Sequence, residues 1–137
     1  MSGTTSPIYN HSFLSETLSL TQEFLSDIVA SINDLGEFSH EKELFWNQHI
    51  TKLSLDISQF VELTTLLSKT AMARKNQSIP EIKESHIQML FIMKAIIQSQ
   101  LKQDYVALEE LIKYELKDNL TQWKIDLIPQ IRKLLNS

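Results

Sequence analysis

The stretch SQLKQDYVALEELIKYELKDNLTQW, residues 99–123, holds two helical patterns joined by a few polar residues. Asp104 stands just before the second pattern, where its side chain can accept hydrogen bonds from the free N–H groups of a first helical turn. The apolar stripe of that second helix consists of Leu108, Leu111, Ile112, Leu116, Leu120, Trp123 and Leu127. Residues at these three- and four-residue steps share one face of a helix. Because the connection is so short, the stretch predicts a hairpin of two antiparallel, neighbouring helices.

Trp123 lies near the far end of this stripe, and we interpret it as a core residue and not as a ligand-stacking residue. It lies about 18 residues from the end of the turn, which corresponds to about 27 Å along a helix. That length brings it opposite the start of the preceding helix, near Ile82 and His86. The sequence therefore predicts that Trp123 anchors the hairpin against that helix.

Glycine and proline are scarce in this chain, with two and three copies in 137 residues. Average usage would give roughly ten glycines and seven prolines. Proteins with sheets need glycine-bearing turns, so this scarcity indicates helices joined by few loops. With 42% hydrophobic residues, the chain is long enough to close one core. We therefore predict an all-α protein with a single domain.

Two helical patterns come early in the chain. The first begins near Ser12, which we expect to cap it, and ends at Gly36 in the left-handed conformation. The second runs from His40 to about Asn76 without Gly or Pro, which predicts one unusually long helix of about 50 Å. Its stripe of four- and three-residue steps is Trp46, Ile50, Leu53, Ile57, Phe60, Thr64, Leu67 and Ala71. This spacing also suits a coiled-coil seam.

A third pattern opens at the sequence SIPE, with Ser78 as the expected N-cap and Pro80 in the first turn. Its expected inward residues are Ile82, His86, Met89, Leu90, Met93, Ile97 and Leu101. Pro129 should kink or end the fourth helix and leave a final turn or a short fifth helix. We therefore predict an up-down four-helix bundle over residues 12–137, preceded by a flexible N-terminal tail over residues 1–11.

The charge of the chain is moderately acidic and unevenly distributed. Its net charge is −4, and all 13 basic residues lie after residue 41. This balance speaks against non-specific binding to nucleic acid, and the acidic first helix either packs beside basic neighbours or faces a basic partner. There is no Cys, hence no disulfide or thiolate chemistry. The longest apolar run, Ile87–Ile97, contains a lysine and is shorter than the about 20 residues of a membrane span, so we expect a cytoplasmic protein.

No arrangement of side chains in the sequence points to a catalytic, cofactor or metal site. A di-iron bundle needs Glu-x-x-His on two helices, whereas this chain has it once, from Glu37 to His40, across an expected loop. Glu109 and Lys113 are spaced to form an ion pair on one helix. His86 lies on an apolar stripe and lacks the Lys and Gly expected after the histidine of a phosphotransfer domain. We therefore predict a non-enzymatic protein with a core or boundary His86, and phosphotransfer is a less favoured alternative.

Four phenylalanines flank the main stripes without belonging to them. They are Phe13, Phe24, Phe38 and Phe45. Apolar side chains beside a core stripe can form the exposed patch that marks a protein-binding surface. The leading hypothesis is therefore a binding module that recognises a helix of a partner protein, without a cofactor. An alternative is a structural homodimer in which the Trp46–Ala71 stripe pairs with its own copy.

The C-terminal segment LKQDYVALEELIKYELKDNLTQWKIDLIPQI resembles the last helical hairpin of small, uncharacterised bacterial proteins. In those proteins a tight turn with Asp-Tyr precedes a helix of the type ALADLLEYELLP and ends in a Trp. Here Lys117 and Asp118 stand where those proteins often have Pro. The resemblance implies a bacterial helical protein and transfers no functional residue. In size, acidity and lack of Cys the chain is also similar to bacterial flagellar and secretion export chaperones, which implies an adaptor or chaperone.

Overall fold

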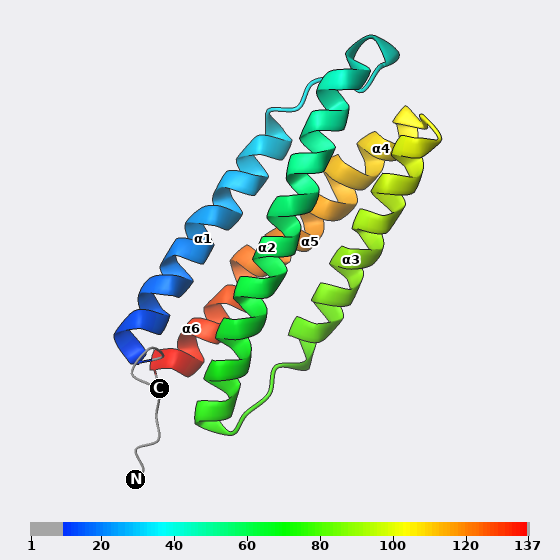
Figure 1. Cartoon of the computed structure of the whole chain (residues 1–137). Coiled ribbons are helices and arrows are strands. Elements are labelled where there is room, and N and C mark those ends of the chain that lie inside the picture. Colours follow the sequence, from blue (N-terminus) through cyan, green and yellow to red (C-terminus); the bar gives the residue numbers. More distant parts are fainter. Residues whose placement is uncertain (1–9, 137) are drawn as a thin grey trace.

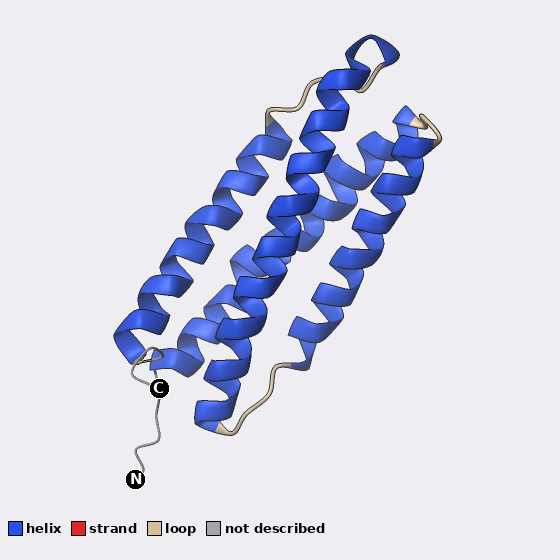
Figure 2. Cartoon of the chain, viewed as in Figure 1, coloured by secondary structure: helices blue, strands red, loops and turns tan. Residues whose placement is uncertain are grey.

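The computed structural model of the protein describes residues 10–136, and the regular structure in this range is entirely helical (Figure 2). In chain order the elements are α1 (His11–Asn33), the 3₁₀ turn η2 (His40–Lys42), α2 (Glu43–Lys75), α3 (Pro80–Leu101), α4 (Tyr105–Glu110), the π-helical η3 (Leu111–Leu116), α5 (Lys117–Gln122), the π-helical η4 (Trp123–Leu127) and α6 (Ile128–Asn136). The last five elements follow one another without a break. We call them together the C-terminal rod. The predicted all-α class is confirmed.

Four helical segments lie side by side, and the chain direction alternates from each to the next (Figure 1). Both ends of the described chain therefore lie at the same end of the molecule. The C-terminal rod crosses obliquely behind α2, so that α4, η3 and α5 pack on α3 while α6 packs on α1 and α2. α3 contacts α2 on one side and the rod on the other, and its outer face is exposed among the described residues.

The long helix α2 follows its predicted stripe throughout. Every residue of the predicted set from Trp46 to Ala71 is buried, and the helix is continuous over 33 residues. A stripe of this kind settles which side faces inward, because polar residues occupy most of the other positions. The same burial places the stripe inside the chain's own core. It is therefore not exposed for the pairing with a second copy that the homodimer alternative assumes.

The inward face of α3 differs from the predicted one. Leu90, Ile97 and Leu101 are exposed and not buried. The residues that α3 does bury are Ile82, Ser85, Met89, Ile92, Met93 and Ile96. Since the sequence is apolar nearly all the way round this helix, its periodicity does not distinguish the two sides. The helix has one apolar face in the core and a second one on the surface.

The ends of α1 lie elsewhere than predicted. The helix begins at His11, and Asn10 caps it because the side-chain oxygen of Asn10 accepts a hydrogen bond from the backbone N–H of Phe13 at 2.8 Å. Ser12 is therefore already inside the helix. The predicted tail over residues 1–11 lies outside the described residues except for its last two, of which one is helical and one is the cap.

Two other predicted helix ends shift as well, whereas one cap is confirmed. α1 stops three residues before Gly36, which does not adopt a positive φ. α3 begins at Pro80 after Ile79, so Ser78 is not its N-cap. The cap of the last helix is as predicted, because Asp104 accepts a hydrogen bond from the backbone N–H of Ala107 at 3.1 Å.

The C-terminal rod continues as a helix past Pro129, so the predicted end of the helix at this proline is wrong. Proline removes an N–H donor and its ring meets the carbonyl group four residues earlier, here that of Ile125. The π-helical segment η4 includes Ile125 and widens the helical turn just before the proline. The other π-helical segment, η3, has a related role: apolar steps of four from Leu108 to Leu120 drift by about 40° per step on an α-helix, and the wider turn offsets that drift.

Candidate functional site

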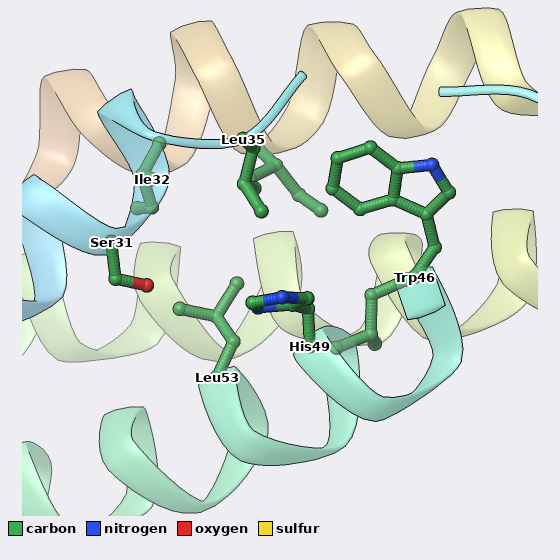
Figure 3. A pocket seen from close by; sticks show the side chains of 8 residues that line it. Ser31, Ile32, Leu35, Trp46, His49 and Leu53 are labelled. Carbon is green, nitrogen blue, oxygen red and sulfur yellow. The ribbon is translucent and has the colours of Figure 1, made fainter. Parts of the chain in front are cut away.

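One small hollow lies where the end of α1 meets the start of α2 (Figure 3). It is lined by Ser31, Ile32, Leu35, Trp46, His49, Ile50, Leu53 and Ile112. His49 and Leu53 reach into it from α2 toward Leu35. Its free volume is about 10 Å³, which has room for about one water molecule. The hollow is therefore too small to bind a substrate or a side chain of a partner.

Lys113 fixes the connector between α1 and α2 beside this hollow. Its ammonium group donates a hydrogen bond to the carbonyl oxygen of Gly36 at 2.9 Å and lies 5.5 Å from the ring centroid of Phe38. The predicted ion pair with Glu109 is confirmed, with an N–O distance of 3.9 Å. Because this pair is on the surface, it contributes little to stability, and the main role of Lys113 is to hold the connector on the rod.

The four phenylalanines predicted to form a partner surface are not brought together. Phe38 is buried and stacks on Trp46 with ring centroids 4.0 Å apart, and Phe24 is half-buried against the core. Phe13 and Phe45 are exposed. Phe13 lies near the start of α1 and Phe45 near the start of α2, which follows the other end of α1, and α1 has 23 residues and hence a length of about 35 Å. Partner binding by this set stays a prediction, with only two of its members on the surface.

The carboxylates of α1 belong to Glu16, Glu23 and Asp27, and all three residues are exposed. Its contact with the basic α6 uses neutral groups instead. Arg132 donates hydrogen bonds to the side chains of Gln22 at 3.0 Å and of Ser19 at 3.4 Å. The acidic helix thus lies beside a basic neighbour and still presents its own charge outward, so binding of a basic partner there stays a prediction.

His86 is a half-buried residue at the boundary of the core, as predicted. Its Nε2 atom lies 2.8 Å from the hydroxyl oxygen of Thr64, and its ring stacks on Trp123 at a centroid distance of 5.0 Å. Trp123 is fully buried and also meets Phe60 edge to face at 5.2 Å. The predicted anchoring of Trp123 against the start of α3 is therefore confirmed. Burial lowers the pKa of His86 from its ordinary value of 6.5.

This lowered pKa should make stability depend on pH. The unfolded chain binds a proton at His86 near pH 6.5, before the folded protein does, so acid favours unfolding. We expect the contribution of His86 to the free energy of unfolding to be complete above about pH 7. It should fall as the pH drops below about 6.5 toward the folded pKa. Urea unfolding of the wild type and of His86→Gln from about pH 8 to about pH 5 measures this contribution as their difference. A difference that is the same at every pH would contradict it.

The most extensive exposed apolar feature is the outer side of α3. Its apolar members are Ile87, Leu90, Phe91, Ile97 and Leu101. Phe91 and Leu101 are the most exposed of them, at 67% and 79%. These residues recur at three- and four-residue steps, so they form one stripe about 21 Å long. Lys94 lies within the stripe and is exposed. We call these six residues the α3 face.

A groove accompanies the α3 face on each side. The groove between α2 and α3 has a volume of about 440 Å³ and is lined by Ser54, Ile57, Ser58, Leu90, Met93, Lys94, Ile97 and Gln98. The groove between α3 and the C-terminal rod has a volume of about 420 Å³ and is lined by Glu84, Ile87, Gln88, Phe91, Ile92, Ala95, Leu111 and Glu115. Both linings are mainly apolar with polar residues at the rim. This arrangement can hold apolar side chains of another molecule and has few groups suited to bond making or breaking.

Sequence reasoning missed the α3 face because it assigned the apolar residues of α3 to the core. A signal was present in the run from Ile87 to Ile97, in which Gln88 and Lys94 are the polar residues. One helix buries about half of its circumference against two neighbours, so a helix this apolar has more apolar surface than its core side can use. Such an excess indicates a second, exposed apolar face.

The described part of the chain has neither a membrane-spanning helix nor a cluster of metal-binding side chains. No helix among residues 10–136 is both long enough and apolar enough to cross a lipid bilayer. In the same range, no group of three or more His, Cys, Asp or Glu side chains is placed to hold a metal ion. Comparison of the chain with protein-family models, curated proteins and solved structures found no match.

Proposed function

We propose that the protein is a non-enzymatic binding module, an adaptor or a chaperone in a bacterial cytoplasm, whose α3 face docks a helix of a partner protein. The observation that carries this proposal is an exposed apolar stripe with a groove on each side. In this proposal the four helical segments form an up-down four-helix bundle with left-handed crossings. Such a bundle is a rigid support for the exposed side of α3, because the opposite side of this helix is buried in the core.

A helix is the partner element that fits these dimensions best. An apolar stripe about 21 Å long matches about 14 residues of a partner helix, with anchors at i, i+3, i+4 and i+7. Lys94 adds a charge within the apolar stripe, and a bound partner would cover its ammonium group. Covering an unpaired charge is costly, so the partner should carry a carboxylate within its own apolar face.

The two alternative functions lack a supporting observation in the described residues. Homodimerisation through the Trp46–Ala71 stripe would require residues that lie in the core. Phosphotransfer would require an accessible imidazole, whereas one nitrogen of His86 is bonded to Thr64 and one ring face lies on Trp123. We therefore propose only the binding function.

Phe91→Glu should remove partner binding without unfolding the protein, because the side chain is exposed and its charge would meet the apolar side of the partner helix. Tagged wild type, Phe91→Glu and a matched control, Leu55→Glu, would be used to capture partners from native lysate. Leu55 is equally exposed, at 68%, but lies on the outer side of α2. We expect one protein to be retained by the wild type and the control and reduced at least about tenfold for Phe91→Glu. Equal recovery on all three would refute the proposal.

A further inference from the structure

We infer that the partner helix lies in the groove between α3 and the C-terminal rod and places a basic side chain beside Glu81 and Glu84 at one end of it. This inference rests on the proposed function, since it names the chemistry of the partner for the same α3 face. The groove has an apolar end and an acidic end. A helix that fills both needs an apolar stripe followed by a basic residue.

The groove is longer than its apolar part. Beyond the hollow of about 420 Å³ beside Phe91, a second hollow of about 370 Å³ continues along the same side of α3. The second hollow is lined by Glu81, Glu84, Ser85, Gln88 and Gln122, and we call it the acidic end. Glu84 and Gln88 line both hollows, so the two form one groove that follows α3 from Glu81 to Ala95. This part of α3 is about 21 Å long.

The charged residues that line this groove are all acidic. They are Glu81, Glu84 and Glu115, and all three are exposed. Among the described residues, no lysine or arginine forms an ion pair with any of them. The charged residue that lines the groove on the other side of α3 is Lys94. A helix with a basic edge is therefore complementary to the groove beside the rod, whereas an acidic edge would be repelled there.

The buried residues at the acidic end also carry hydrogen-bond acceptors. Ser85 and Asn119 are each 3% exposed, and the amide nitrogen of Asn119 donates hydrogen bonds to the carbonyl oxygen of Ser85 at 3.3 Å and to Oε1 of Gln88 at 2.8 Å. The hydroxyl oxygen of Ser85 and the amide oxygen of Asn119 have no hydrogen-bond partner among the described residues. A buried oxygen without a partner is costly, so an N–H donor close to it is favourable. The guanidinium group of arginine combines several such donors with a positive charge, so it suits this end better than a neutral or acidic side chain.

The geometry of α3 sets the spacing of these groups in the partner. Phe91 beside the apolar end and Glu84 at the acidic end differ by seven positions, so they lie on one side of α3 and about 10 Å apart along it. A partner helix that runs along the groove has the same rise per residue. Its arginine should therefore be about seven residues away from the apolar residue that packs on Phe91.

Binding of two synthetic helical peptides to the full chain tests this inference. Both peptides have leucines at i, i+3 and i+4, and the residues seven positions beyond the last two are arginine in one peptide and glutamate in the other. Fluorescence anisotropy at about 50 mM salt should show at least about tenfold tighter binding of the arginine peptide. Raising the salt to about 500 mM should remove most of this preference, because salt screens exposed charges.

Two variants separate the charges of the groove from the net charge of the protein. The groove variant combines Glu81→Gln, Glu84→Gln and Glu115→Gln. The control variant removes three charges from exposed positions of α1 and α2, by Glu16→Gln, Glu23→Gln and Glu62→Gln. The preference for the arginine peptide should fall to about twofold or less in the groove variant and stay at about tenfold in the control. Far-UV circular dichroism of each variant shows that it is folded.

The remaining outcomes overturn the inference and are distinct from failure of the proposed function. If the wild type binds both peptides equally, or if the groove variant keeps the preference, the acidic end does not select the partner. Loss of that binding in Phe91→Glu would then show that the α3 face still docks a helix, so that the proposed function stands. If neither peptide binds, the inference is also wrong, and capture of a Phe91-dependent protein from lysate decides the proposed function by itself.

Discussion

Trp123→Ala should lower the free energy of unfolding by about 3–5 kcal/mol, the usual cost of removing a fully buried aromatic side chain. The indole has no exposed surface and touches two aromatic rings, those of His86 on α3 and Phe60 on α2. It therefore joins three of the helical segments at one point. The neighbouring rings belong to rigid helices, so they cannot close the cavity that alanine leaves, and the full cavity cost should be measured.

Urea unfolding followed by circular dichroism measures this change, because removing Trp123 also removes much of the fluorescence signal. Ile125→Ala is the matched control: Ile125 is 70% exposed on the same rod, and its loss should cost within about 0.5 kcal/mol. If Trp123→Ala does not fold, Trp123→Phe provides the comparison and should lose less. No described residue accepts a hydrogen bond from the indole N–H, so phenylalanine loses volume but no such bond. An alanine variant as stable as wild type would show that Trp123 is not a core anchor.

Trp46→Ala should cause a loss of similar size, about 3–5 kcal/mol, at the other end of the core. Trp46 is 1% exposed and lies face to face with Phe38, with an interplanar angle of 6°. Its removal enlarges the hollow between α1 and α2 and takes away the surface on which Phe38 is stacked. The connector from α1 to α2 then keeps the hydrogen bond of Lys113 to Gly36 and the packing of Leu35 on the core.

Phe45→Ala is the control for this change, since Phe45 touches the same indole edge to face at 5.2 Å but is 47% exposed. We expect it to cost about 1 kcal/mol, because half of its surface is already in water. Proteolysis of the folded protein at the connector gives a second readout, and it should accelerate for Trp46→Ala more than for Phe45→Ala. Equal losses in the two variants would mean that stacking on Phe38 contributes little.

The sequence predicts the course of α2 better than that of α3, for one physical reason. In α2 the polar positions are numerous enough that only the Trp46–Ala71 side can face a core, and all of that side is buried. In α3 the apolar run Ile87–Ile97 satisfies several orientations equally, and the neighbouring helices decide between them. Tertiary contacts thus choose the face wherever the helical periodicity is weak.

The sequence pattern also does not predict the first residue of α1 or the π-helical segment η3. Asn10 and Ser12 are both good capping residues, and two residues of difference lie within the ordinary scatter of helix ends. Nothing in the sequence marks η3, whereas Pro129 is a visible sign that the helix near η4 must depart from α geometry. Asp104 was predictable because a turn this short leaves only one residue in position to cap the last helix.

The sequence predicts an exposed apolar patch, but the structure has its largest group of exposed apolar residues on α3 and not on the four predicted phenylalanines. An exposed apolar patch was expected on Phe13, Phe24, Phe38 and Phe45, chosen because they lie beside the stripes. Two of these are covered by neighbouring rings or by the core. Residues that lie on a stripe, such as Leu90 and Ile97, supply the observed patch. Their exposure follows from the position of α3 at the edge of the fold, which depends on how all four segments pack.

For the gene that encodes this chain, η3 marks a place where one codon can be lost at little structural cost. Deleting a residue inside an α-helix rotates everything beyond it by about 100° and turns buried side chains outward. In α2 such a deletion would misplace half of the helix. Hydrogen bonds in η3 span one residue more than in an α-helix, so a deletion there converts the wide turn to an ordinary one. Leu120 and Trp123 would still face the core, and length variants among descendants of this gene should occur at residues 111–116 as well as in its loops.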